Sequence, residues 1–162
     1  SSDVPTAMQN RTSTLEENSP SVTPETLRDY PIRIEQPVVW GEIDHNGHVN
    51  NIWYFRYIEN ARVELYRRLG KYDDILAHDT TLVVASTRCR FRKALVLGDI
   101  VVTGVKVDAI ENDRFDTSYR IVRRADSVLV AEAEAKIVCV DSERQCKTAL
   151  PGEVRRILER YR

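Results

Sequence analysis

The sequence predicts a single α+β domain in which one long helix packs across a curved antiparallel sheet. Two observations carry this prediction. A helical periodicity is confined to residues 51–69, and residues 80–140 read as consecutive strands joined by short turns. Strands and helices do not alternate as they do in βαβ units, so the later strands should run antiparallel. A chain of 162 residues is long enough for one well-packed core.

The first part of the chain is polar. Residues 1–28 contain three prolines and few large apolar side chains, which is typical of a mobile arm, and a short helical turn is expected at Pro24–Arg28. The domain itself is expected over residues 29–162. Its first strand, 31–40, alternates apolar and charged side chains and should be interrupted near Pro37.

The predicted helix spans residues 51–69. Apolar side chains recur every three or four residues, which places them on one face of a helix. They are Tyr54, Ile58, Ala61, Leu65 and Leu69. Asn50 is expected to cap the start of the helix, because the side-chain oxygen of Asn accepts hydrogen bonds from the free N–H groups of the first turn. Gly70 is expected to end the helix, because Gly tolerates a left-handed backbone.

The strands after the helix are separated by turns expected at 98–99, 111–113 and 123–127. A short helix is expected at 151–161. One face of the last strand is predicted to consist of Leu129, Ala131, Ala133, Ala135, Ile137 and Cys139. Its small alanines would let the long helix approach closely. Valine-rich strands on both faces indicate a partner subunit.

Composition excludes several classes of function. The 24 basic and 25 acidic residues give a net charge of −1, which offers no general reason to expect nucleic acid. No apolar run reaches the roughly 20 residues that cross a bilayer, so no membrane partner is expected. Three cysteines without CxxC spacing favour a reducing compartment. We expect a cytoplasmic protein, or an organellar one if a segment upstream of Ser1 was removed.

Chemistry is expected at the junction of the first strand and the helix. Residues 40–51 read Trp-Gly-Glu-Ile-Asp-His-Asn-Gly-His-Val-Asn-Asn. Asp44 thus precedes a helix whose first N–H groups carry the positive end of its dipole. A carboxylate beside a ready-made anion site suits acyl transfer, although turn carboxylates often only cap their turn.

The two histidines of this turn, His45 and His48, lie three residues apart. Catalytic zinc needs three protein ligands, and no third ligand completes the set, so no metal is expected. His48 is expected to brace the turn by hydrogen bonding, with a secondary role in orienting Asp44 or the substrate.

Residues 40–51, followed by Tyr54, Arg56-Tyr57, Glu59 and Ala61-Arg62, resemble the opening of hotdog-fold thioesterases. The subgroup of 4-hydroxybenzoyl-CoA thioesterase and related short-chain acyl-CoA thioesterases is the one they resemble. Further matches are Arg90-Phe91, Leu97-Gly98-Asp99 and the alanine-rich strand 131–140. The resemblance covers about residues 32–151. It departs at Glu42, where the family commonly has Asp.

The resemblance implies a central helix wrapped by an antiparallel sheet, assembly as a homodimer or homotetramer, and active sites at the dimer interface. It implies hydrolysis of an acyl-CoA without a cofactor. Asp44 would attack the thioester carbonyl or activate water, and the backbone N–H of Asn51 would polarise the carbonyl oxygen. Glu59 is the second candidate for the catalytic acid, unless it pairs with Arg62.

Substrate contacts are expected in two places. Near the helix start, aromatic side chains would line an acyl or aryl pocket unless they belong to the core; these are Trp53, Tyr54 and Tyr57. A basic cluster would bind the phosphates of CoA unless it is a solvated strand face. It consists of Arg88, Arg90, Arg92 and Lys93.

Three other functions stay open on the sequence. The chain could release a polyketide or fatty acyl group from a carrier protein, which would need a carrier docking surface. A hotdog dehydratase would use His48 with a carboxylate. A non-catalytic acyl-CoA-binding module would bind thioester without turnover.

Overall fold

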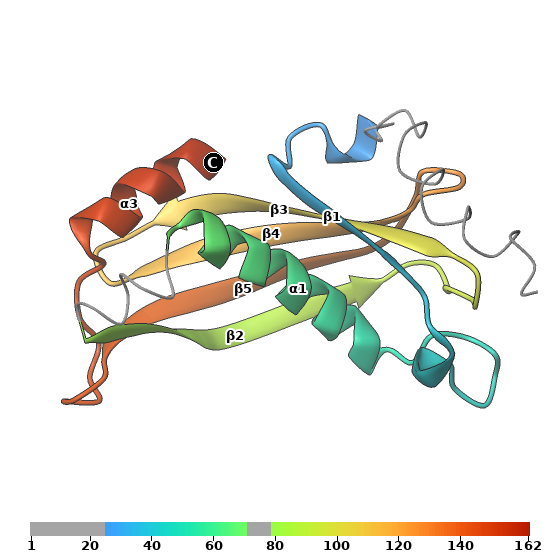
Figure 1. Ribbon diagram of the computed structural model, residues 1–162, viewed down its shortest axis with the longest axis horizontal. Coiled ribbons are helices and arrows are strands. Elements are labelled where there is room, and N and C mark those ends of the chain that lie inside the picture. Colours follow the sequence, from blue (N-terminus) through green and yellow to red (C-terminus); the bar gives the residue numbers. More distant parts are fainter. Residues whose placement is uncertain (1–24, 71–78) are drawn as a thin grey trace, which may run out of the picture.

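The computed structural model describes residues 25–70 and 79–162. Most of the predicted arm, residues 1–28, lies outside these ranges. The predicted α+β class is confirmed, because five strands form a single antiparallel sheet and one long helix crosses it (Figure 1). The strands are β1 (Ile32–Pro37), β2 (Thr80–Phe91), β3 (Ile100–Ile110), β4 (Arg114–Arg123) and β5 (Val128–Asp141).

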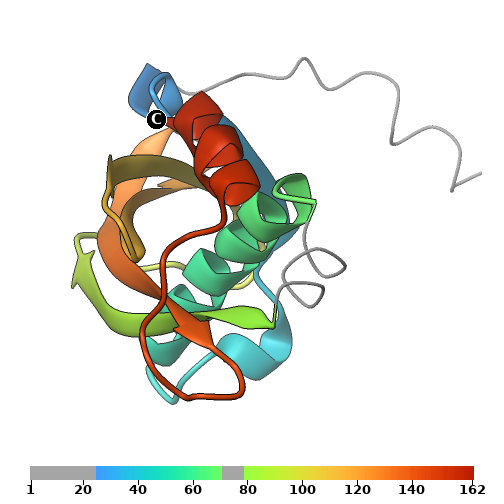
Figure 2. The same cartoon turned by 90° about the vertical axis from the view of Figure 1, so that its left-hand side faces the viewer.

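The helices are α1 (Ile52–Arg68) and α3 (Gly152–Leu158), with 3₁₀ segments η2 (Glu25–Leu27), η3 (Trp40–Glu42) and η4 (Glu159–Tyr161). The strand order is β1-β3-β4-β5-β2, so β1 and β2 form the two edges of the sheet. The sheet curls around α1 (Figure 2). None of the helices within 25–70 and 79–162 is long and apolar enough to cross a membrane.

Helix α1 buries the face that the sequence predicted. The five apolar side chains at spacings of three and four are at most 3% exposed, and they join the main core. The helix begins where Asn50 Oδ1 accepts a hydrogen bond from the Ile52 N–H at 3.1 Å. It ends before Gly70, whose φ is +75°. Both predicted ends of α1 are therefore confirmed to within a residue or two.

Strand β5 differs from the prediction at one position. Ala131 lies on the inner face as predicted, but Leu129 faces outward. The register explains why: Ile121 of β4 pairs with Ala131 and Val122 pairs with Leu129, so Val130 is an extra residue in a β-bulge. The outward cluster that Leu129 joins contains Leu27, Tyr30, Val102 and Val122. In addition, α1 packs chiefly against β3 and β1 rather than against the alanines of β5.

The segment before β1 lies on the outer face of the sheet. Leu27 is fully buried there, and Tyr30 is 6% exposed. The chain can approach this closely because β3 has a glycine at the contact. A Cβ on Gly104 would lie 2.8 Å from Tyr30 Cβ and 2.9 Å from Leu27 Cδ2. Any larger residue at this position must displace the segment.

Candidate functional site

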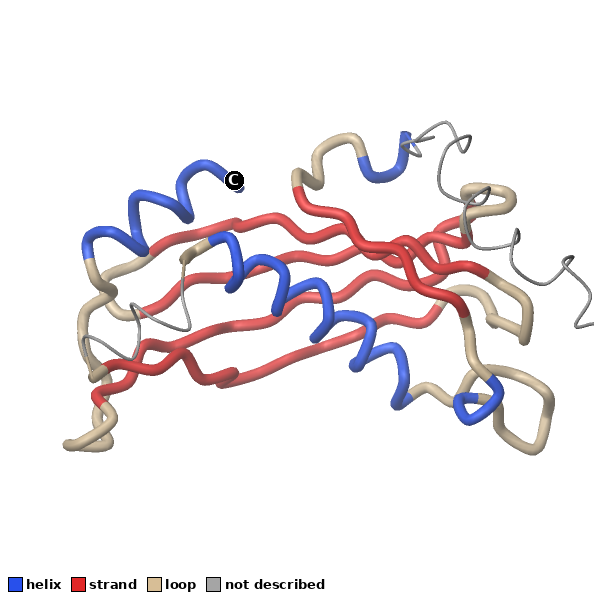
Figure 3. Tube along the Cα trace, viewed as in Figure 1, coloured by secondary structure: helices blue, strands red, loops and turns tan. Residues whose placement is uncertain are grey.

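A short hairpin carries Asp44 to one end of the sheet. Figure 3 shows this loop after η3 at the same end as the start of α1 and the β2–β3 connection. Its base is an isolated antiparallel bridge between Ile43 and Val49. Above the bridge, the Asp44 N–H donates to the His48 carbonyl oxygen at 2.7 Å. Gly47, with a φ of +79°, provides the left-handed residue that this tight turn requires.

The Asp44 carboxylate is held by main-chain donors. Its Oδ1 accepts hydrogen bonds from the N–H groups of Asn46, at 2.8 Å, and His48, at 3.2 Å. Desolvation raises the pKa of Asp44, but these two bonds and the nearby charges of His45 and His48 outweigh it. The net pKa is lowered, so the carboxylate is ionised at neutral pH. His48 thus braces the turn through its backbone.

Asp44 and the start of α1 line the same pocket, which has a volume of about 420 Å³. Its walls are Asp44, His48, Val49, Asn50, Asn51, Tyr54, Phe91, Arg92, Lys93 and Ala94. Within residues 25–70 and 79–162, the N–H of Asn51 donates to no protein acceptor. The pocket therefore combines an ionised carboxylate, a free amide at a helix start and two cationic side chains.

The other helix residues predicted for the site lie elsewhere. Trp53 and Glu59 line a smaller pocket of about 240 Å³ on the exposed side of α1. Glu59 accepts a hydrogen bond from Arg56 at 2.8 Å, so the alternative in which it pairs with Arg62 is wrong. Arg62 instead donates to the Tyr119 hydroxyl at 3.3 Å. On a helix, Glu59 can pair with the residue three positions before it, Arg56, or three positions after it, Arg62. Because Arg62 is engaged by Tyr119 of the sheet, Glu59 pairs with Arg56.

Tyr57 is fully buried in the core. Its hydroxyl donates to Glu42 Oε1 at 2.9 Å. This position gives no support to a contact with substrate. Tyr54, one turn earlier, does reach the pocket, and its ring lies edge-on against Phe91 with centroids 5.0 Å apart. Of the three predicted aromatic contacts, only Tyr54 lies beside Asp44.

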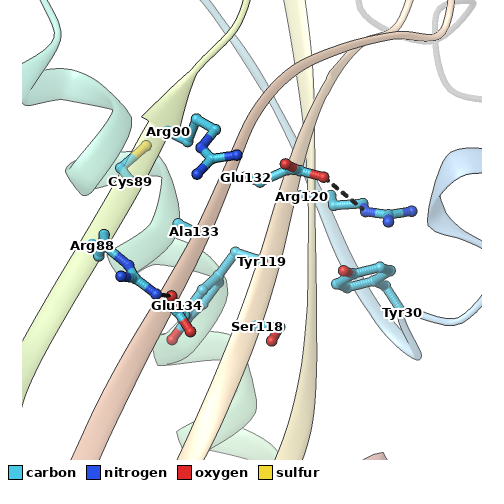
Figure 4. A pocket seen from close by; sticks show the side chains of 10 residues that line it. All are labelled: Tyr30, Arg88, Cys89, Arg90, Ser118, Tyr119, Arg120, Glu132, Ala133 and Glu134. Carbon is cyan, nitrogen blue, oxygen red and sulfur yellow. Dashed lines mark hydrogen bonds and ion pairs between the residues drawn. The ribbon is translucent and has the colours of Figure 1, made fainter.

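The predicted basic cluster is divided between two pockets. Arg92 and Lys93 line the Asp44 pocket, whereas Arg88 and Arg90 line a pocket of about 450 Å³ on the outer sheet face (Figure 4). Lys93 is an odd number of residues from Arg88 and Arg90, so strand alternation alone would direct it to the opposite face. At the end of β2, both the Arg92 and the Lys93 N–H donate to the Val130 carbonyl oxygen, at 2.8 and 3.1 Å.

Two glutamates, Glu132 and Glu134, offset part of the charge of the three arginines that line the outer pocket. Arg88 forms an ion pair with Glu134, and Arg120 lies 3.9 Å from Glu132 (Figure 4). Arg92 also pairs with Glu132, at 2.7 Å. No such ion pair involves Lys93 in the described part of the chain, so its ammonium group is the cation most available to a ligand at the Asp44 pocket.

The cysteines lie apart from the Asp44 pocket. Burial raises the pKa of the Cys89 thiol to about 11, and burial also raises the pKa of Cys139. Cys146 is exposed. Across residues 25–70 and 79–162, no three His, Cys, Asp or Glu side chains are placed to hold a metal ion.

Two features of the site were missed from the sequence. One is the bulge at Val130, because a single extra residue leaves no mark in an apolar strand. The other is the buried bond between Glu42 and Tyr57. The acidic residue two positions before Asp44 was its only signal, and nothing in the spacing pointed to Tyr57.

Comparisons with known proteins show the family to which the chain belongs. The model of the thioesterase-like superfamily matches residues 38–158. The long-chain acyl-CoA thioesterase FadM of Escherichia coli (strain K12) is 28% identical over 117 residues, which are 72% of this chain and 89% of FadM. The acyl-CoA thioesterase YbgC of Haemophilus influenzae is 25% identical over 128 residues, which are 78% of this chain and 90% of YbgC.

A solved structure shares the architecture. It is a thioesterase from Thermus thermophilus complexed with coenzyme A and zinc, with a TM-score of 0.72 and 22% identity over 83% of this chain and 96% of that one. This likeness confirms the hotdog fold. Because the family model matches most of the chain, from the residue after β1 to the end of α3, the chain belongs to the thioesterase-like superfamily.

Proposed function

We propose that the protein hydrolyses an acyl-CoA thioester to a free carboxylic acid and CoA. One observation carries the proposal: Asp44 and the start of α1 line one pocket. Thioester hydrolysis needs a base or nucleophile on one side of the carbonyl and hydrogen-bond donors at the developing oxyanion on the other. The names of FadM and YbgC, both acyl-CoA thioesterases, support this substrate class.

In the proposed mechanism, the thioester carbonyl carbon faces Asp44 and its oxygen faces the N–H of Asn51. As a nucleophile, the carboxylate forms an anhydride and expels the CoA thiolate, and water then cleaves the anhydride. As a base, it takes a proton from water, whose oxygen adds to the carbonyl before the thiolate leaves. In both routes the oxyanion is stabilised by the amide and the helix dipole, and loss of one such donor typically costs about 3 kcal/mol.

The CoA phosphates are assigned to Lys93 and Arg92, because both basic residues line the same pocket as Asp44. Arg88 and Arg90 open onto the outer sheet face. They do not line the Asp44 pocket and are not assigned to CoA. His48 lines the pocket as well and would orient substrate.

We also propose that the chain forms a homodimer through β2. Within the described residues this twelve-residue strand is an edge of the sheet, and Val83, Val84 and Phe91 on it are 37–45% exposed. A long apolar edge of this kind favours pairing with another strand. Phe91 also lines the Asp44 pocket, so the dimer would close the pocket on its exposed side.

The decisive experiment measures thiol release from acyl-CoA by wild type and Asp44→Asn. The variant should lose about 10²- to 10⁴-fold in kcat/KM, as expected when a general base or nucleophile is removed. Asp141→Asn is the matched control. The Asp141 carboxylate also accepts hydrogen bonds from two backbone N–H groups of a turn, those of Glu143 at 2.9 Å and Arg144 at 2.8 Å. Asp141 does not line the Asp44 pocket. Equal rates for Asp44→Asn and wild type would refute the assignment.

The same assay on other substrates separates the remaining functions. Faster hydrolysis of carrier-protein thioesters than of CoA thioesters would favour release from a carrier protein. Binding of acyl-CoA without turnover by wild type would identify a non-catalytic module. Water addition or loss on a 3-hydroxyacyl or enoyl thioester would identify a hydratase.

A further inference from the structure

The carboxyl group of Glu42 is buried between the Asp44 hairpin and helix α1. The residue is 5% exposed. Its Oε1 accepts two hydrogen bonds of 2.9 Å, one from the hydroxyl of Tyr57 on α1 and one from the N–H of Val39. Among the acidic residues of the described chain, Glu42 is the only one that is buried.

Glu42 also closes the base of the hairpin through its main chain. Its carbonyl oxygen accepts a hydrogen bond from the N–H of Asn50 at 2.9 Å. Asn50 in turn caps α1 through its side chain, and its carbonyl oxygen accepts the N–H of Trp53 at 3.0 Å. Glu42 therefore contacts both the base of the hairpin and, through Tyr57, the helix whose first amides face the pocket.

A buried carboxyl group is costly, and apolar residues of similar size would usually fill such a place more favourably. The two donors satisfy Oε1 of Glu42, but they do not explain why a polar group is used there. Burial, together with the hydrogen bond and charge of Glu42, raises the pKa of Tyr57, so its hydroxyl remains a donor at every working pH. The hydrogen bond between Glu42 and Tyr57 constrains the distance and angle between the two side chains more tightly than an apolar contact would.

We propose that Glu42 is a positioning residue that, through Tyr57, sets the Asp44 hairpin relative to the start of α1. Asp44 is two residues from Glu42, and the hydrogen bonds that its side chain accepts come from within the hairpin. The orientation of the hairpin against α1 thus depends on its base. The inference rests on the proposed function, since it concerns how the carboxylate and the Asn51 amide reach one thioester group.

The test compares Tyr57→Phe and Glu42→Gln in the full chain, with kcat and KM for an acyl-CoA. Tyr57→Phe keeps the ring in the core and removes one donor. We expect kcat to fall about 10- to 100-fold with little change in KM, as misplacement of a catalytic group by about 1 Å can do. Glu42→Gln keeps an oxygen that accepts both bonds, so kcat should stay within about threefold of wild type.

Two measurements separate positioning from other roles. The pH dependence of kcat/KM should be the same in Tyr57→Phe as in wild type, because Asp44 keeps its hydrogen bonds. If Glu42 acted through its charge, Glu42→Gln would instead shift the profile and lose activity. Tyr119→Phe is the matched control for stability, since it also removes a buried phenol hydroxyl, one bonded to Thr117 at 2.7 Å. It should lower stability and leave kcat unchanged.

The outcomes are distinct. If Tyr57→Phe is as fast as wild type while Asp44→Asn is inactive, the positioning role is wrong and the proposed function stands. If Tyr57→Phe and Tyr119→Phe lose the same fraction of kcat, Tyr57 is only structural and the inference also fails. If Asp44→Asn is fully active, the proposed function fails first.

Discussion

The hydroxyl of Tyr54 donates a hydrogen bond to the main-chain carbonyl oxygen of Lys93 at 3.3 Å. This bond joins the first turn of α1 to the segment that leaves β2. The two residues lie 39 positions apart in the sequence, and both line the Asp44 pocket. The wall of the pocket that carries its free cation is thus attached directly to the helix that carries its free amide.

The hydrogen bond between Tyr54 and Lys93 should lower the KM for acyl-CoA. Tyr54→Phe keeps the ring against Phe91 and removes only the hydroxyl. A typical intramolecular hydrogen bond contributes about 1 kcal/mol, so we expect KM for acyl-CoA to rise about fivefold if the Lys93 segment loosens. Steady-state kinetics on wild type and variant would check this. An unchanged KM would show that the segment is held without this bond.

If Asp44 is the catalytic carboxylate, its lowered pKa should set the pH dependence of activity. A carboxylate whose pKa is below the ordinary 3.8 stays ionised from neutral pH down into the acid range. As the pH falls, kcat/KM should therefore hold until below about pH 4, and then decline as Asp44 is protonated. Circular dichroism at each pH would establish that the protein is still folded. An acid limb near pH 6 would point to a histidine instead.

Lys93 is expected to recognise the CoA moiety rather than the acyl group. A hydrogen bond to a charged group contributes about 1.5–3 kcal/mol, so Lys93→Met should raise KM for acyl-CoA by about tenfold or more. It should leave KM unchanged for the matching acyl-pantetheine, which lacks the nucleotide phosphates. Arg88→Met, on the outer sheet face, is the control and should affect neither substrate. A similar loss on both substrates would contradict the assignment.

Gly104 is expected to tolerate no side chain. Gly104→Ala would press a methyl group to within 3 Å of Tyr30 and Leu27, and overpacking of this kind typically costs about 1–3 kcal/mol. Urea unfolding would measure the loss. Gly152→Ala is the control, because a Cβ there meets nothing within 4 Å and Gly152 begins α3. A stable Gly104→Ala would mean that the η2 segment moves aside freely.

The proposed dimer can be tested at β2. Wild type should sediment at twice the mass of one chain, and Val83→Lys, which places a charge on the exposed edge, should shift the protein toward monomer. Leu97→Lys, at a side chain that is 51% exposed away from β2, should have no such effect. A monomeric wild type that hydrolyses acyl-CoA would remove the need for a shared site.

Local sequence signals were sufficient for the fold. The spacing of Tyr54, Ile58 and Leu65 defined α1, and Asn50 and Gly70 marked its ends, because helix periodicity and end residues depend on nearby positions alone. The position of Leu129 was not predictable in this way. A β-bulge shows itself only against the partner strand, and β4 with its Ile121–Val122 register shift is that partner.

The site was predictable where its residues are adjacent in sequence. Asp44, His48 and Asn51 lie within eight positions, and the structure brings all three to one pocket. Arg88 and Lys93 are also close in sequence but line different pockets, because side chains five residues apart on a strand point to opposite faces. The contact between Glu42 and Tyr57 depends on tertiary packing, which sequence spacing does not encode.

The three cysteines have a practical consequence for kinetic work. Chromogenic disulfide reagents count every reactive sulfhydryl, including those of the enzyme. Cys89 and Cys139 should react slowly, because burial holds their thiols protonated, while the exposed Cys146 should give a rapid background of about one equivalent. Replacing Cys146 with serine would remove that signal, and the native residue offers a point for attaching a fluorophore outside the Asp44 pocket.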